Sequence, residues 1–169
     1  MTRVRALATA AALLGPLLLA GCGIKPTGPV DSGSAATVVV AGPDGFSVLY
    51  FLGPGGRLVP SPQRDMPKVP PFEVLNRLLD GPGQREQEAG LTTEVPSLHG
   101  WRLDSAAVSF GPRNEITARL PFAAEDLTDN ARRQLVCSLA STGAKGARIT
   151  VVLKGPTGSL EAVGCDGLP

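Results

Sequence analysis

The sequence has few of the residue types from which many active sites are built. It contains one histidine, three cysteines, one tryptophan and one tyrosine among 169 residues. A single histidine, with no two cysteines at CxxC spacing, does not support a zinc or redox site. Sixteen Lys and Arg residues stand against 15 Asp and Glu, which leaves no basic excess to neutralise a nucleic-acid backbone. We therefore expect no metal, no cofactor and no nucleic-acid partner.

The chain nevertheless has enough apolar residues for a folded domain. Hydrophobic residues make up 43% of it and charged residues only 18%, a balance that excludes a wholly disordered protein. The length suits one domain with a short appendage. Twenty-one glycines and 16 prolines divide that domain into short segments.

The N-terminus has the pattern of an export signal. Arg3 and Arg5 precede an uncharged, mostly apolar stretch from Ala6 to Leu19. The following Leu19-Ala20-Gly21-Cys22 resembles the lipobox of bacterial lipoproteins. The resemblance implies that residues 1–21 are a signal peptide and that the Cys22 thiol is lipidated. It places the mature protein at the cell membrane, anchored by lipid on the extracytoplasmic face.

Two alternatives to a lipid anchor remain open. The uncharged segment 6–24 is close to the ~20 residues that span a bilayer, although Gly15-Pro16 interrupts it. Ordinary secretion, with Cys22 merely near the cleavage site, is the other. Residues 22–41 are rich in Gly, Pro, Ser and Ala, which predicts a flexible tether. Residues 42–169 would then form the folded domain.

Cys137 and Cys165 are the two cysteines left once Cys22 is lipidated. In an oxidising compartment an even pair predicts a disulfide, and two free, buried thiols are the alternative. The disulfide would add about 3–4 kcal/mol to the stability by restricting the unfolded chain.

Hydrophobic periodicity predicts three hairpins and two principal helices. The hairpins are expected at 46–52 with 57–61, at 101–110 with 115–120, and at 147–153 with 160–163. The helices are expected at 71–80 and 128–139, with a short exposed helix at 84–89. This order predicts a single small α+β domain, in which both principal helices cover one face of a mainly antiparallel sheet. Four prolines between residues 61 and 71 predict irregular structure there, and alternation predicts that Phe110 faces the core.

Several motifs along this order resemble the GerMN domain of bacterial sporulation and germination proteins. The most specific are Leu78-Leu-Asp-Gly-Pro82 and Gly90-Leu-Thr-Thr-Glu-Val-Pro96. Val48-Leu-Tyr-Phe51 precedes them and Ile149-Thr-Val-Val-Leu153 follows. The resemblance implies a non-catalytic, extracytoplasmic module that contacts an envelope protein or cell-wall material such as peptidoglycan. The chain holds a single copy with no tandem partner, which argues against ring building.

The candidate binding surface combines the proline-rich segment 62–71 with the connector 81–96, because loops on a rigid scaffold commonly carry binding. Arg64, Thr92 and Thr93 are its candidate residues. Each also has a structural interpretation: Arg64 as a solvated charge, and the two threonines as hydrogen-bonding residues of a connector.

Two other functions remain open. A small envelope hydrolase would use His99 with Ser97 or Ser109 and with Asp104, although the chain has no G-x-S-x-G motif. The chain could instead be a self-assembling structural lipoprotein. We expect no catalytic residues.

Overall fold

The computed structural model describes residues 46–98, 100–144 and 147–167. The expected signal peptide, the tether, Cys22 and His99 lie outside the described residues. No helix within the described ranges has both the length and the apolar character needed to cross a membrane.

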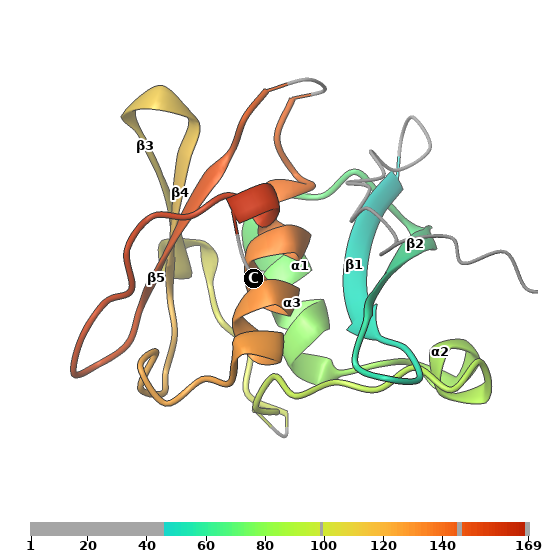
Figure 1. The fold of residues 1–169 in the computed structure, drawn as a ribbon. Helices are drawn as coiled ribbons and strands as arrows, with labels where there is room; N and C mark the ends of the chain where they lie inside the picture. The colour runs from blue at the N-terminus through green and yellow to red at the C-terminus, as the bar shows by residue number, and fades with distance from the viewer. Residues whose placement is uncertain (1–45, 99, 145–146, 168–169) are drawn as a thin grey trace, which may run out of the picture. The chain divides into compact units, whose positions relative to one another are not determined.

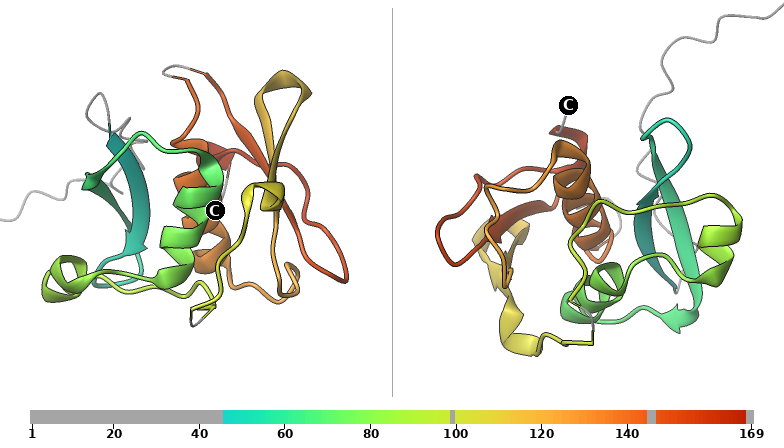
Figure 2. Two further views of the ribbon diagram at one scale, coloured as in Figure 1. Left: turned by 180° about the vertical axis from the view of Figure 1, so that it is seen from behind. Right: turned by 90° about the horizontal axis from the view of Figure 1, so that it is seen from below.

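The domain has three layers, with helices between two sheets (Figures 1 and 2). The first sheet is a hairpin of β1 (Phe46–Leu52) and β2 (Leu58–Pro67). The middle layer consists of α1 (Pro71–Asp80) and α3 (Asp129–Ala140). A short helix, α2 (Gln84–Glu88), lies near the turn of the first hairpin (Figure 1).

The second sheet has the order β3-β4-β5. Its strands are β3 (Val108–Gly111), β4 (Glu115–Arg119) and β5 (Thr150–Lys154). β3 and β4 are antiparallel, whereas β4 and β5 are parallel because the chain crosses from one to the other through α3. The expected last hairpin is present only as two isolated bridges, Lys154 to Ser159 and Val151 to Val163.

The predicted α+β class in one small domain is confirmed, and so are the positions of both principal helices. Their place differs from the expectation, because they lie between two sheets and not on one face of a single sheet. Six consecutive residues of α3, from Gln134 to Leu139, are buried. Six residues exceed one helical turn, so this part of the helix has no solvent-facing side and needs cover all round.

β2 continues to Pro67, which corrects the prediction that residues 61–71 are irregular. Pro60 lies opposite Tyr50 and Pro62 opposite Val48. Tyr50 and Val48 direct their backbone groups away from β2, toward α3. The two proline nitrogens therefore point to the open edge of the hairpin, where no ladder hydrogen bond is lost.

The prediction that Phe110 faces the core is wrong. Phe110 is 73% exposed, whereas Ile116, directly opposite it on β4, is 1% exposed. Opposite residues of an antiparallel pair share a face, so Phe110 does lie on the same face of the sheet as the buried Ile116. The core ends between these two strands, because β3 is the edge of its sheet.

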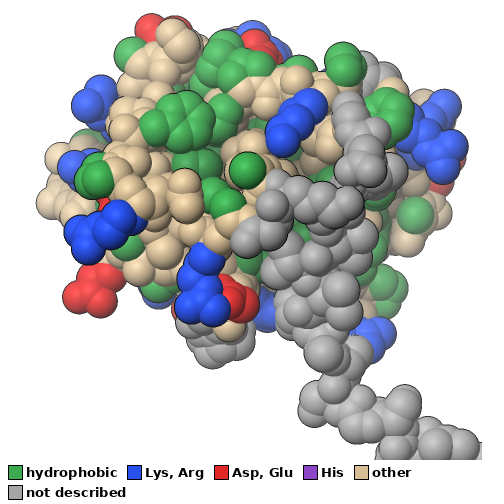
Figure 3. Space-filling view, turned by 90° about the horizontal axis from the view of Figure 1, so that it is seen from above, with side chains coloured by type: hydrophobic (Ala, Val, Ile, Leu, Met, Phe, Trp, Pro, Cys, Tyr) green, Lys and Arg blue, Asp and Glu red, His purple; other side chains and the backbone are tan. Residues whose placement is uncertain are grey.

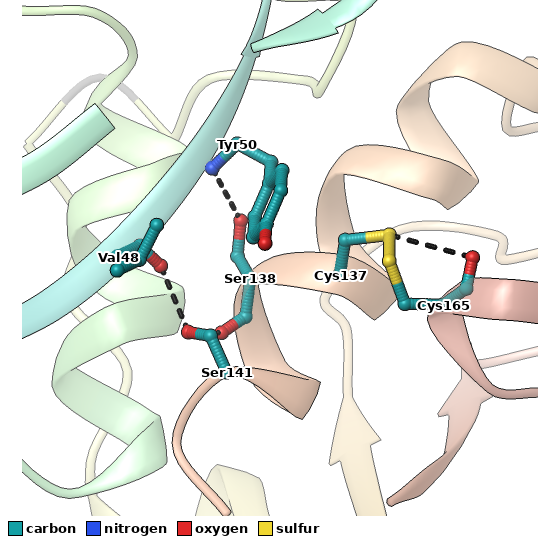
Figure 4. Close-up of a disulfide and its surroundings, with 6 residues drawn as sticks. All are labelled: Val48, Tyr50, Cys137, Ser138, Ser141 and Cys165. Carbon is teal, nitrogen blue, oxygen red and sulfur yellow. Dashed lines mark hydrogen bonds between the residues drawn. A yellow bond between two sulfur atoms is a disulfide. The ribbon is translucent and has the colours of Figure 1, made fainter. Parts of the chain in front are cut away.

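The predicted disulfide between Cys137 and Cys165 is confirmed. It ties α3 to a turn of 3₁₀ helix at Cys165–Gly167, near the end of the chain (Figure 4). Both cysteines are buried, and Val48 and Tyr50 of β1 pack in the same cluster. The disulfide therefore secures the C-terminal segment to the central helix.

Candidate functional site

The free edge of β1 is closed by side chains of α3 and of Ser141, the residue that caps its C-terminal end. Ser138 Oγ accepts a hydrogen bond from the Tyr50 amide at 2.9 Å, and Ser141 Oγ donates to the Val48 carbonyl at 2.9 Å (Figure 4). One turn earlier on the helix, Gln134 Nε2 donates to the Tyr50 carbonyl at 3.1 Å. The spacing of these three residues places them on one helix face, alongside the strand. This fixes the hairpin, including β2, against the helical layer.

Thr92 and Thr93 also contribute to the hydrogen bonds that cover the end of β1 and hold Gln134 in place. The backbone N–H and C=O of Thr92 bond to those of Leu52 at 2.8 and 2.9 Å. The hydroxyl of Thr93 lies 3.2–3.4 Å from the amide group of Gln134 and accepts a hydrogen bond from the Val95 amide at 3.1 Å. Both threonines thus have the structural role that the sequence left open as an alternative.

A groove of about 830 Å³ lies between β2 and the segment that joins α1 to α2. Residues 61–64 of β2 line one wall, and residues 80–86 line the other. Leu49 and Phe51, each 1% exposed, lie buried beneath its floor, and Leu91 is a partly exposed apolar residue of its lining. We call this feature the β2–α2 groove.

The end of α1 sets the direction of the second wall. Gly81 has φ 85°, a left-handed value that favours glycine, and its amide bonds to the Leu78 carbonyl at 3.1 Å. Pro82 follows and prevents the helix from continuing. The Gly81-Pro82 pair therefore ends α1 and turns the chain toward α2.

Glu86 holds the two walls together. Its Oε1 atom accepts hydrogen bonds from Ser61 Oγ at 2.9 Å and from Gln63 Nε2 at 3.0 Å. Partial burial alone would raise the pKa of Glu86, but these two bonds and the positive charge of Arg77 outweigh burial and lower it. Glu86 is therefore an ionised carboxylate at neutral pH, held in place by β2.

The other two carboxylates of the groove also have partners. Asp80 forms an ion pair with Arg102 at 3.4 Å, and Glu88 accepts a hydrogen bond from Gln84 at 2.8 Å. Arg64 and Arg85 are exposed, and no side-chain hydrogen bond or ion pair joins either of them to another described residue. The unfilled hydrogen-bonding capacity of the groove is thus concentrated in these two guanidinium groups.

Of the three candidate residues, the structure places only Arg64 in the groove. The two segments predicted to form the surface do meet there, because 62–64 and 81–86 lie on opposite walls. Sequence reasoning missed Ser61, Gln63 and Glu86, since residues 84–89 were predicted only as a short exposed helix. The polar Ser61 and Gln63, two apart and alternating with prolines, were the available signal for a polar strand face.

The residues of the alternative hydrolase site are only partly described. Asp104 Oδ1 accepts a hydrogen bond from the Ala106 amide and caps a 3₁₀ turn, and Ser109 lies exposed on β3. His99 lies outside the described residues, so its geometry with them stays untested. Within the described ranges, no three His, Cys, Asp or Glu residues gather closely enough to hold a metal ion.

Comparison of the chain with known protein families, with curated proteins and with solved structures returns no match. The surface seen from above shows hydrophobic side chains interspersed with polar atoms and with side chains of both charge signs (Figure 3). Neither finding identifies a ligand.

Proposed function

We propose that this protein is a membrane-anchored extracytoplasmic lipoprotein whose folded part is a non-catalytic, GerMN-like binding module. Lipid on Cys22 would hold it at the membrane, with residues 22–41 as the tether. The β2–α2 groove would bind an envelope protein or a cell-wall component. The lipobox-like segment Leu19-Ala20-Gly21-Cys22 supports the anchor.

One observation carries the binding proposal. The two predicted segments, 62–71 and 81–96, contribute residues to the opposite walls of one groove. The groove has a fixed framework, since Glu86 binds Ser61 and Gln63 across it. Fixed walls lower the entropy cost of binding, which favours recognition. A carboxylate held ionised by two hydrogen bonds is also a poor proton donor, which argues against Glu86 as a general acid.

Crosslinking of the tagged protein in living cells, with mass spectrometry of what it captures, tests this function. The wild type should capture a reproducible protein or peptidoglycan fragment. Replacing Gly83 by Trp should abolish the capture, because a large side chain would obstruct a groove that Gly83 lines. Far-UV circular dichroism should show an unchanged fold.

Lys154→Glu provides the matched control. Lys154 is exposed at the end of β5, in the other sheet, and does not line the groove. This variant should capture the same partner as the wild type. Capture that survives Gly83→Trp would contradict the groove as the binding site, and exclusive self-crosslinks would favour the self-assembling alternative.

A further inference from the structure

In the β2–α2 groove, the carboxylates have hydrogen-bond or ion-pair partners, whereas two of the arginines have none among the described residues. All three of its carboxylates, Asp80, Glu86 and Glu88, already accept hydrogen bonds or form an ion pair. Arg64 and Arg85 make no such contact with any other residue in the described part of the chain. An occupant can therefore gain most by supplying acceptors to these two side chains.

The two arginines flank the contact that joins the walls. Arg64 follows Gln63 on β2, and Arg85 precedes Glu86 on α2. The hydrogen bond between Gln63 and Glu86 fixes the backbone from which both guanidinium groups extend. A guanidinium offers a planar fork of donors that matches a carboxylate in a bidentate pair. Arg64 and Arg85 both line the groove, one on each wall.

The fixed carboxylates limit what can approach these forks. An anion with a charge on every unit would meet the ionised Glu86 between the two arginines, and like charges at short range repel. A chain whose acidic groups alternate with neutral ones avoids this repulsion. Its backbone amides can also donate to the outward-facing carbonyl of Pro62, which lines the groove and has no N–H. An extended peptide supplies the acidic groups, the neutral groups between them and the backbone amides.

We propose that the β2–α2 groove binds an extended acidic segment of a partner protein, with carboxylates on Arg64 and Arg85. This inference rests on the proposed function and names the chemistry of its partner. The partly exposed side chain of Leu91 suits a neutral residue of such a segment.

The test uses the purified full chain in detergent and a short, fluorescently labelled peptide of alternating Asp and Ser. Fluorescence anisotropy should show binding that weakens as salt is added. Arg64→Gln and Arg85→Gln should each raise the Kd roughly three- to tenfold. Arg64→Lys should recover only part of the loss, because it keeps the charge but not the fork.

Arg57→Gln is the matched control, since Arg57 is exposed on the β1–β2 turn and does not line the groove. Its Kd should equal that of the wild type. Equal affinities for Arg64→Gln, Arg85→Gln and the wild type would overturn the proposal. Tighter, arginine-dependent binding of linear polyphosphate would also overturn it, in favour of a phosphate polymer.

The failure of this inference is distinguishable from failure of the proposed function. If the acidic peptide does not bind but capture in cells still depends on Gly83, the groove binds a partner of another chemistry. If capture in cells is independent of the groove, the proposed function itself fails, whatever the peptide does.

Discussion

Gln134 shows how much a single buried polar residue organises in this fold. It is 0% exposed, and its amide group bonds to the Tyr50 carbonyl at 3.1 Å and to the Glu94 amide at 3.0 Å. It thereby joins α3, the edge of β1 and the connector after α2. Buried polar groups of this kind stabilise a fold only while every partner is satisfied.

We expect Gln134→Leu to lower the free energy of unfolding by about 1–3 kcal/mol, because it removes the hydrogen bonds that Gln134 makes with the buried Tyr50 carbonyl and with the Glu94 amide. Urea unfolding followed by far-UV circular dichroism measures the change. Arg133→Leu, at the adjacent and half-buried position, should change the free energy by less than about 1 kcal/mol. Equal losses in the two variants would contradict the assigned role of Gln134.

At the scale of the elements, the strand edges are closed in different ways. Side chains of α3 cover β1, and prolines occupy the outward positions of β2. The segment after β5 returns along that strand and bonds to it at Val151 and Leu153. Open edges favour pairing with other chains, and prolines and covering elements are known protections.

We expect Pro60→Val with Pro62→Val to promote self-association, because it restores two outward N–H groups on β2. The free energy of unfolding should change by no more than about 1 kcal/mol, the span of strand propensities. Light scattering over a range of protein concentrations measures the association. Pro156→Val, at an exposed position outside any strand, should remain like the wild type. Monomers at all concentrations would contradict the protective role of the prolines.

At the scale of the whole molecule, the proposal divides the chain between an anchor and a domain. We expect Cys22→Ser to abolish labelling by palmitate in cells and to retain the signal peptide, because the thiol is the proposed attachment point. Radiolabelling and intact mass measure both effects. The double variant Cys137→Ser with Cys165→Ser should remain labelled, since those residues form the disulfide. Normal labelling of Cys22→Ser would contradict the anchor.

Local patterns predicted the elements well where the chain itself dictates them. Pro71 and Gly81 bound α1 at the predicted residues, and α3 begins and ends one residue from the predicted 128–139. The failures occur where an element's neighbours decide the outcome. Prolines are compatible with β2 because it is an edge strand, and Phe110 is exposed because the core ends at β4.

The candidate site shows the same division. Sequence reasoning identified its two segments and Arg64, because loop composition is a local property. It missed the contact of Glu86 with Ser61 and Gln63, which joins residues more than 20 positions apart. A solvated glutamate and an anchored one have the same sequence signature, and only the packing of α2 against β2 separates them.

The sequence by itself determined the α+β class and the principal helices, because these follow from periodicity and capping, and it predicted the disulfide that the structure confirms. It also supplies the grounds for proposing a lipid anchor. The tertiary structure alone decided that the helices lie between two sheets, that β4 and β5 are parallel and that two distant segments form one groove. These features depend on which apolar surfaces pack against each other. The hydrophobic effect is not directional, so a local sequence pattern shows that a surface will be buried but not which element will cover it.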